Sequence, residues 1–259
     1  HIDKFLEYQN KADRIITANT LVEKRLLNWG VEKNKVVKIP IGIDVDTFHR
    51  KDEKAKLDIR KILKIPNDVN VIGSFQKDGN GWGKGLTPKL IKGPDIFLSV
   101  VEKLAKQVAV HVLLTGPARG YVMNGLRRIG VPFTHRYPKS VKELASLYNA
   151  LDLYMITSRE EGGPKGLLEG MASGVPVVST NVGMASDLLV DNTSGGVVPV
   201  DNVEQLVIKA GQIIRMEKQQ KETLIRNARE NVLKCDWKVV ARNHWENVYL
   251  PLLEAIESK

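Results

Sequence analysis

The chain has 259 residues, 42% of them apolar and 27% charged, which is ordinary for a soluble globular protein with a sizeable core. No segment approaches the ~20 apolar residues that span a bilayer. No secretory signal is visible, and the single cysteine, Cys235, excludes an internal disulfide framework. We therefore expect a cytoplasmic protein; because the chain begins at His1 rather than Met, the question of a missing native start stays open.

The net charge of +9 is compatible with binding to nucleic acid, to an anionic membrane surface or to an acidic ligand. Basic residues are spread along the chain and alternate with acidic ones, as in segments 51–64 and 215–229, and we find no nucleic-acid-binding motif. We therefore expect no nucleic-acid partner. Solvated helix faces account for the charge, and a patch in peripheral contact with a membrane is the alternative.

The first part of the chain predicts a few short elements and then a linker. The elements are a helix end at 1–12, strands at 13–18 and 35–40, a helix at 20–29, and a charged helix at 51–64. The linker, 41–48, contains Asp44 and Asp46, and paired carboxylates can hold a divalent cation. Because this pair lies in a linker pattern, far from the glycine turn at 162–163, we expect no metal site.

From residue 69 onward, short apolar strands alternate with amphipathic helices. The strands fall at 69–75, 108–115, 131–135, 151–156, 175–180 and 196–198, and the helices at 94–106, 118–129, 140–150, 164–174, 185–190 and 202–216. This alternation predicts an α/β fold, a doubly wound, Rossmann-like parallel sheet with helices on both faces. Ligands of such sheets bind at the carboxyl ends of the strands, so we expect the residues that follow the strands to share one site.

A long glycine-rich connection, 76–94, joins the first of these strands to the next helix. Its glycine spacing fits neither the dinucleotide-binding fingerprint nor a Walker loop. Its length predicts that the connection is mobile or functional.

The most informative stretch is 157–178, which predicts a strand end, a glycine turn, a helix and the next strand. Gly162 and Gly163 permit a sharp turn, and Pro164 suits the first helical position. A helix that starts after a strand presents free N–H groups and favours an anion such as phosphate. Glu161 and Glu169 flank this helix start, where carboxylates would accept hydrogen bonds from sugar or ribose hydroxyls. The alternative is an ordinary strand–helix unit with two solvated glutamates.

Residues Glu161 to Val178 read Glu-Gly-Gly-Pro-Lys-Gly-Leu-Leu-Glu-Gly-Met-Ala-Ser-Gly-Val-Pro-Val-Val. This sequence closely resembles the signature of the retaining GT-B glycosyltransferases of the group 1, or family 4, type, and the resemblance extends from about Ala12 to Ala255. It implies transfer of a sugar from a UDP-, GDP- or ADP-sugar to an acceptor hydroxyl, with retained configuration and without a metal or other cofactor. It further implies a glycan or lipid-linked acceptor.

The resemblance also implies roles for individual residues. Lys92 matches one of two basic residues that bind the donor diphosphate, and Lys77 matches the other less closely because an insertion separates the pair. Glu161 would hold sugar hydroxyls and Glu169 the ribose diol. Tyr137 would contact the nucleotide base, or it is a plain surface tyrosine. The remaining donor-binding candidates are Gly73, Gly162, Gly163, Pro164, Lys165, Gly166 and Leu167, of which Lys165 is either a helper or only solvated.

By the same resemblance, residues 1–50 would be a remnant of the N-terminal acceptor domain with its linker, 51–235 the nucleotide-sugar-binding domain, and 236–259 a C-terminal helix that crosses back. We expect Pro251 to kink that helix. Its apolar stripe comprises Trp237, Ala241, Trp245, Val248, Leu252 and Ile256. The missing part of the acceptor domain motivates an alternative, a donor-binding half that needs a partner subunit or homodimer contact. A nucleotide-sugar epimerase is a further alternative.

Overall fold

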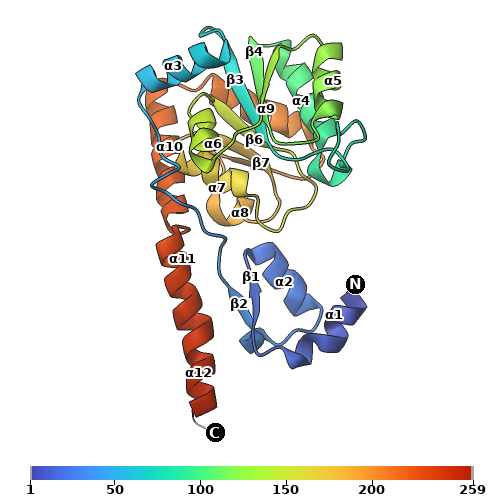
Figure 1. Ribbon diagram of the computed structural model, residues 1–259, viewed down its shortest axis with the longest axis vertical. Helices are drawn as coiled ribbons and strands as arrows, with labels where there is room; N and C mark the ends of the chain where they lie inside the picture. The colour runs from blue at the N-terminus through green and yellow to red at the C-terminus, as the bar shows by residue number, and fades with distance from the viewer. Residues whose placement is uncertain (1, 258–259) are drawn as a thin grey trace.

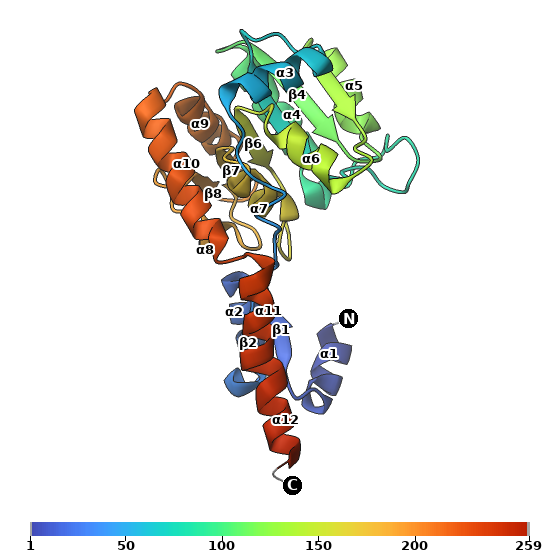
Figure 2. The same ribbon diagram turned by 60° about the vertical axis from the view of Figure 1, so that its left-hand side comes forward.

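The computed structural model describes residues 2–257 and shows a large α/β unit above a small N-terminal unit, with the C-terminal helix running alongside the latter (Figures 1 and 2). The large unit contains six parallel strands in the order β5-β4-β3-β6-β7-β8. These are β3 (Asn70–Phe75), β4 (Val110–Thr115), β5 (Phe133–Arg136), β6 (Leu153–Ile156), β7 (Val177–Thr180) and β8 (Gly196–Val198). The predicted doubly wound sheet is confirmed.

Helices cover both faces of this sheet and bury two separate apolar clusters. One cluster contains residues of α3 (Glu53–Leu63), α6 (Val141–Tyr148), α7 (Lys165–Ala172), α8 (Ala185–Leu188) and α10 (Lys218–Leu233). The other contains residues of α4 (Pro94–Ala105), α5 (Gly120–Arg128) and α9 (Val203–Ile214). Helix α10 overlaps the segment whose charges were expected on a solvated helix face, and its opposite face buries four residues.

The N-terminal unit is a small parallel pair of strands with a helix between them. Its elements are α1 (Ile2–Tyr8), a 3₁₀ turn η1 (Gln9–Lys11), β1 (Ile15–Thr17), α2 (Thr20–Asn28), a second turn η2 (Lys33–Lys35) and β2 (Val36–Lys38). In the linker, Asp44 accepts hydrogen bonds from the backbone N–H groups of Asp46 and Thr47 and from the Thr47 hydroxyl, so it shapes a local turn.

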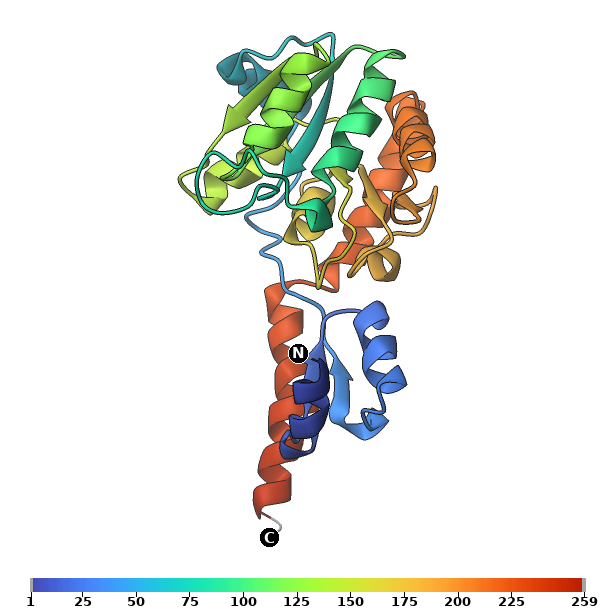
Figure 3. The ribbon, with the colours of Figure 1, turned by 90° about the vertical axis from the view of Figure 1, so that its right-hand side faces the viewer.

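The C-terminal helix runs through α11 (Trp237–His244), a π-helical turn η4 (Trp245–Tyr249) and α12 (Leu250–Glu257). The predicted kink at Pro251 is wrong: Figures 1 and 3 show no sharp bend, because the wider π turn before the proline relieves its ring. Val240 and Val248 pack against Ile39. Four members of the predicted stripe are exposed: Trp237 and Trp245 with 52% and Ile256 with 68% of their surface, and Ala241. Residues 258 and 259, the end of the predicted helix, lie outside the described residues.

Between residues 2 and 257, the chain forms no helix that is long and apolar enough to cross a membrane.

Asp152 ties α3 to the centre of the sheet. One of its oxygens accepts hydrogen bonds from the Val71 N–H (2.8 Å) and from Arg60 Nη2 (2.6 Å), and the other from Lys56 Nζ (2.7 Å). Burial would raise the pKa of Asp152, but Lys56 and Arg60 hold that pKa below its ordinary value. The charged carboxylate is therefore stabilised in the folded chain.

Replacing Asp152 with Asn should lower the free energy of unfolding at pH 7 by about 3 kcal/mol, because Arg60, whose side chain is only 4% exposed, loses its anion. A depressed folded-state pKa contributes stability above the ordinary value of about 4 and loses it as pH falls, so the difference should shrink toward pH 3. Urea denaturation of the parent and the variant at pH 7 and pH 3 measures this difference in the free energy of unfolding. Asp58→Asn, at an exposed position of α3, is the control, and equal stability of Asp152→Asn and the parent at pH 7 would contradict the assignment.

Candidate active site

The predicted glycine turn lies at the carboxyl end of β6 and leads into α7. Helix α7 begins at Lys165, one residue later than predicted, so Pro164 is its N-cap residue rather than its first helical residue. Gly174 follows the end of the helix and has a φ of +69°. The backbone N–H groups of Gly163, Lys165 and Gly166 find no acceptor among residues 2–257. The N-terminal end of α7 is therefore open to an anion.

Two glycines let α7 and its turn approach their neighbours closely. A Cβ on Gly166 would lie 2.2 Å from the hydroxyl oxygen of Tyr154, on β6. A Cβ on Gly163 would lie 2.4 Å from a side-chain carbon of Ile41, in the linker. Larger residues at either position would push the helix start away from the sheet edge.

Lys92 and Glu161, which the sequence placed in the same site, form an ion pair. Lys92 Nζ donates to both carboxylate oxygens of Glu161, at 2.6 and 2.7 Å, and Ser158 Oγ donates to Oε1 at 2.7 Å. The two charged side chains are 25% and 12% exposed, so the pair is partly screened from solvent. This arrangement places a cation and a carboxylate beside the open end of α7.

The backbone next to Lys92 is fixed to the end of β6. Gly93 adopts the left-handed conformation with a φ of +61°, and a Cβ there would lie 1.8 Å from the carbonyl oxygen of Thr157. Thr157 Oγ1 in turn donates to the Gly93 carbonyl at 2.8 Å. Only glycine fits this contact, which fixes the position of the Lys92 backbone relative to the end of β6.

Glu169 lies in the second turn of α7 and is held by Tyr148, which sequence reasoning missed. The fully buried Tyr148 donates its hydroxyl proton to Glu169 Oε2 at 2.8 Å. Burial raises the pKa of Glu169, while the Tyr148 hydrogen bond and the charge of Lys165 act in the opposite direction. Oε1 receives no hydrogen bond from the described residues, so it is available to a ligand hydroxyl.

Other predicted site residues lie apart from this cluster. Lys77 Nζ stacks on the ring of Trp82, 3.8 Å from its centroid. Tyr137 is 64% exposed and follows the edge strand β5, three strand spacings or about 14 Å from β6, so it could reach only the far end of an extended ligand. Gly73 lies inside β3 with the Leu151 side chain against it, and the strand continues to Phe75. The predicted ligand contact of Gly73 stays a prediction.

The glycine-rich connection is packed on α5. The carbonyls of Lys84 and Gly85 accept hydrogen bonds from the N–H groups of Gly120 and Tyr121, each at 2.8 Å. Near its base, Arg119 Nε lies 2.9 Å from Asp78 Oδ1, and both side chains are at most 1% exposed. The contact is an ion pair rather than a well-aligned hydrogen bond, since both atoms lack a hydrogen-bond partner among the described residues.

The N-terminal unit closes the site from the opposite side. Asn19, which caps α2, donates to the Gly162 carbonyl at 2.5 Å, and Arg25 pairs with Glu160 at 2.8 Å. A cavity of about 70 Å³ remains between α2 and residues 159–161, with Glu161 in its wall. The candidate site thus borders a small cavity between the two units.

Comparison with known proteins identifies the family. A sequence model described as "Glycosyl transferases group 1" matches residues 85–216, just over half of the chain. The chain belongs to the group 1 glycosyltransferases. The D-inositol 3-phosphate glycosyltransferase of Corynebacterium urealyticum is 24% identical over 94% of the chain and 56% of its own length. That of Mycobacterium leprae is 28% identical over 80% and 47%. This group 1 glycosyltransferase chain therefore spans about half the length of the curated relatives it matches.

Solved structures share its fold. A glycosyltransferase from Rickettsia africae superposes with a TM-score of 0.78 at 20% identity, over 94% of this chain and 65% of that one. Anabaena Alr3699/HepE, solved in complex with UDP-glucose, superposes with a TM-score of 0.77 at 19% identity, over 100% of this chain and 67% of that one. These likenesses show that the group 1 sequence adopts the GT-B type of α/β fold.

Replacing Glu169 with Gln should leave the folded chain at least as stable as the parent at pH 7. The pKa of Glu169 is raised in the folded chain, so the folded chain holds this proton more tightly than the unfolded chain does. The free energy of unfolding therefore falls as the pH rises from the ordinary glutamate pKa through the raised pKa of the folded chain. Gln carries no charge to bury and can still accept from Tyr148. Chemical denaturation at pH 4 and 7 tests this, with the exposed Glu230→Gln as control; a loss of more than about 1 kcal/mol at pH 7 would show that the charge of Glu169 stabilises the fold.

Proposed function

We propose that this chain binds the nucleoside-diphosphate-sugar donor of a glycosyltransferase reaction that transfers the sugar, with retained configuration, to an acceptor hydroxyl. The observation that carries the proposal is the open N-terminal end of α7, with the Lys92–Glu161 pair on one side and Glu169 on the other. The motif from Glu161 to Val178 and the family membership support it.

The chemistry of such a transfer suits these groups. The bond that breaks joins the sugar to a diphosphate, so the main task is to stabilise the negative charge that grows on the leaving oxygen. Lys92 and the free N–H groups of Gly163, Lys165 and Gly166 supply positive charge for this purpose, and no metal ion is required. Glu161 would hold sugar hydroxyls, and Oε1 of Glu169 would accept from the ribose diol.

Donor binding requires the Lys92–Glu161 contact to change. An incoming diphosphate would compete with Glu161 for Lys92, and Glu161 would exchange that ammonium for sugar hydroxyls. Ser158, already bonded to Oε1, would help to keep the Glu161 carboxylate in place during the exchange. The ion pair is thus a preformed arrangement in which each partner is ready for one end of the donor.

A second candidate is a donor-binding half that turns over only together with further polypeptide. The observation that favours it is the length of the chain, about half that of its curated relatives. Donor binding without transfer or hydrolysis by the purified chain would support this candidate, and transfer by the chain alone would support the first.

Thermal unfolding with UDP-, GDP- and ADP-glucose should reveal stabilisation by one nucleotide class, and UDP-glucose is the first to test because the HepE structure contains it. Lys92→Met and Glu169→Gln should each weaken the affinity for that donor at least tenfold, since each removes one charged contact. Lys89→Met, an exposed lysine of the same connection, is the matched control. Undiminished stabilisation of both site variants would place the donor elsewhere.

A further inference from the structure

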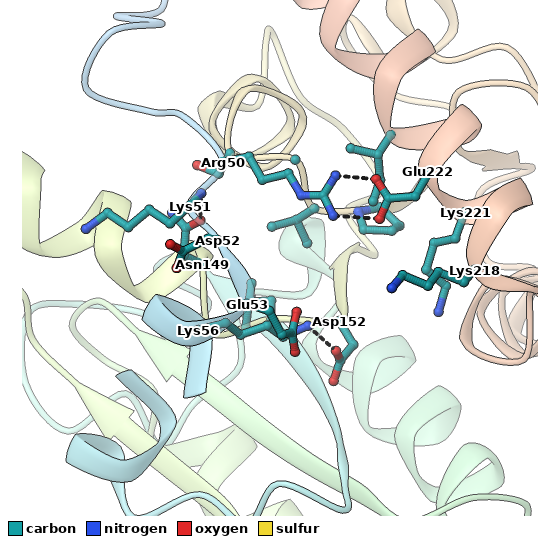
Figure 4. A pocket seen from close by; sticks show the side chains of 16 residues that line it. Arg50, Lys51, Asp52, Glu53, Lys56, Asn149, Asp152, Lys218, Lys221 and Glu222 are labelled. Atoms are coloured by element: carbon teal, nitrogen blue, oxygen red, sulfur yellow. Dashed lines mark hydrogen bonds and ion pairs between the residues drawn. The ribbon is translucent and has the colours of Figure 1, made fainter. Parts of the chain in front are cut away.

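A second cavity lies at the opposite edge of the sheet, where the strands begin. Its volume is about 730 Å³, and its walls come from the linker and start of α3, the ends of α6 and α7, and the first half of α10. Figure 4 shows the charged side chains that line it. None of them belongs to the candidate active site, and nothing in the proposed function uses this space.

The α10 side of the cavity carries unbalanced positive charge. Lys218 and Lys221 lie in the first turn of α10 and extend toward Lys56 and Asp152 (Figure 4). Neither lysine has a carboxylate within ion-pair distance among the described residues. The N-cap residue of α10, Glu217, makes no capping hydrogen bond with its side chain, and the first turn that follows contains no acidic residue. Cations at a helix N-terminus repel the helix dipole, so this wall favours an anion.

Lys221 is the most constrained of these cations. It donates a hydrogen bond to the backbone carbonyl of Ile214, at 3.2 Å. Burial lowers the pKa of Lys221, Asp152 acts in the opposite direction, and the like charge of Lys56 lowers it further. Lys56 itself is occupied by Asp152 at 2.7 Å. An anion beside Lys221 would stabilise its charged form, because it would offset both the cost of burying the ammonium group and the repulsion by Lys56.

The opposite wall offers oxygen acceptors instead. Glu53, at the start of α3, makes no hydrogen bond or ion pair with a described residue, and Asp52 uses one oxygen to cap α3. Two other carboxylates are already engaged, Glu222 by Arg50 and Asp152 by Lys56. Carboxylate oxygens without a donor are suited to hydroxyl groups. The cavity thus pairs an anion-binding wall with a hydroxyl-binding wall.

We propose that this cavity binds a phosphorylated sugar or polyol, with the phosphate at Lys218 and Lys221 on α10 and the hydroxyl groups toward Glu53 on α3. The inference does not depend on the function proposed for the other edge of the sheet. A volume of about 730 Å³ accommodates a ligand of this size together with water.

Isothermal titration calorimetry of the full chain with glucose 6-phosphate tests the proposal, with inorganic phosphate and glucose as probes of each half. The parent should bind glucose 6-phosphate at least tenfold more tightly than either probe. The double variant Lys218→Met/Lys221→Met should weaken this binding at least tenfold, and Glu53→Gln should reduce it toward the affinity for inorganic phosphate. The melting temperature of the double variant, measured without ligand, reports whether the chain stays folded, since the variant relieves repulsion at the helix N-terminus but loses the Lys221 hydrogen bond to Ile214.

Two control variants distinguish binding in this cavity from attraction by net charge and from binding at the candidate active site. Lys24→Met/Lys33→Met removes the same net charge at exposed positions of the N-terminal unit and should leave binding unchanged. Lys92→Met should also leave it unchanged, because Lys92 lies at the other edge of the sheet. The proposal is overturned if the parent does not bind glucose 6-phosphate, if Lys92→Met alone abolishes binding, or if the charge-matched control weakens binding as much as the cavity variant.

Discussion

The site depends on the close contact between α7 and the strand that precedes it. Gly166 and Gly170 face Tyr154 across this contact, where an added Cβ would lie 2.2 Å from the Tyr154 hydroxyl and 3.6 Å from its Cβ, respectively. Because the two glycines carry no side chain, α7 packs directly on the Tyr154 side chain, and its free N–H groups emerge beside the end of β6. Lys92 reaches the same point because Gly93 fits directly against Thr157. Backbone proximity, rather than long flexible side chains, assembles the positive half of the site.

The two carboxylates of the site are stabilised to different degrees. Glu161 is balanced by Lys92 and Ser158, so its charge is compensated without a ligand. Glu169 has only the Tyr148 hydroxyl, and burial works against its charged form. Burial thus disfavours the charged form of Glu169, and one of its oxygens has no donor among the described residues.

Sequence reasoning was most accurate where local signals are strong. Ser140, Asn202 and Asp52 cap α6, α9 and α3 through their side chains, and the glycine at 174 stops α7, so element limits fell within a few residues of those observed. The ion pair of Lys92 with Glu161 was foreseen only as membership of one site, through the family resemblance. Tyr148 could not be foreseen, because a tyrosine on an apolar helix face carries no sign of the carboxylate that it meets in the fold.

Some features of the structure lie beyond the range of sequence patterns. The donor contact expected of Lys77 stays a prediction, and the sequence gives no sign that the insertion after Lys77 brings Trp82 over its ammonium group. Pro251 was expected to break its helix, but a π turn upstream absorbs the steric conflict. In the segment 215–229, exposed Lys218 and Arg226 fit the expected solvated helix face, and Leu224 and Ile225 lie on the face that packs inward.

Helix α7 links the two edges of the sheet. Its N-terminal end faces the candidate donor site, and its C-terminal glycine, Gly174, lies against the aliphatic part of Arg50, where a Cβ would be 2.7 Å from Cδ. Arg50 is bound in turn by Glu222 of α10, which also lines the second cavity. Helix α7 therefore contacts the wall of the second cavity at its C-terminal end and the candidate active site at its N-terminal end.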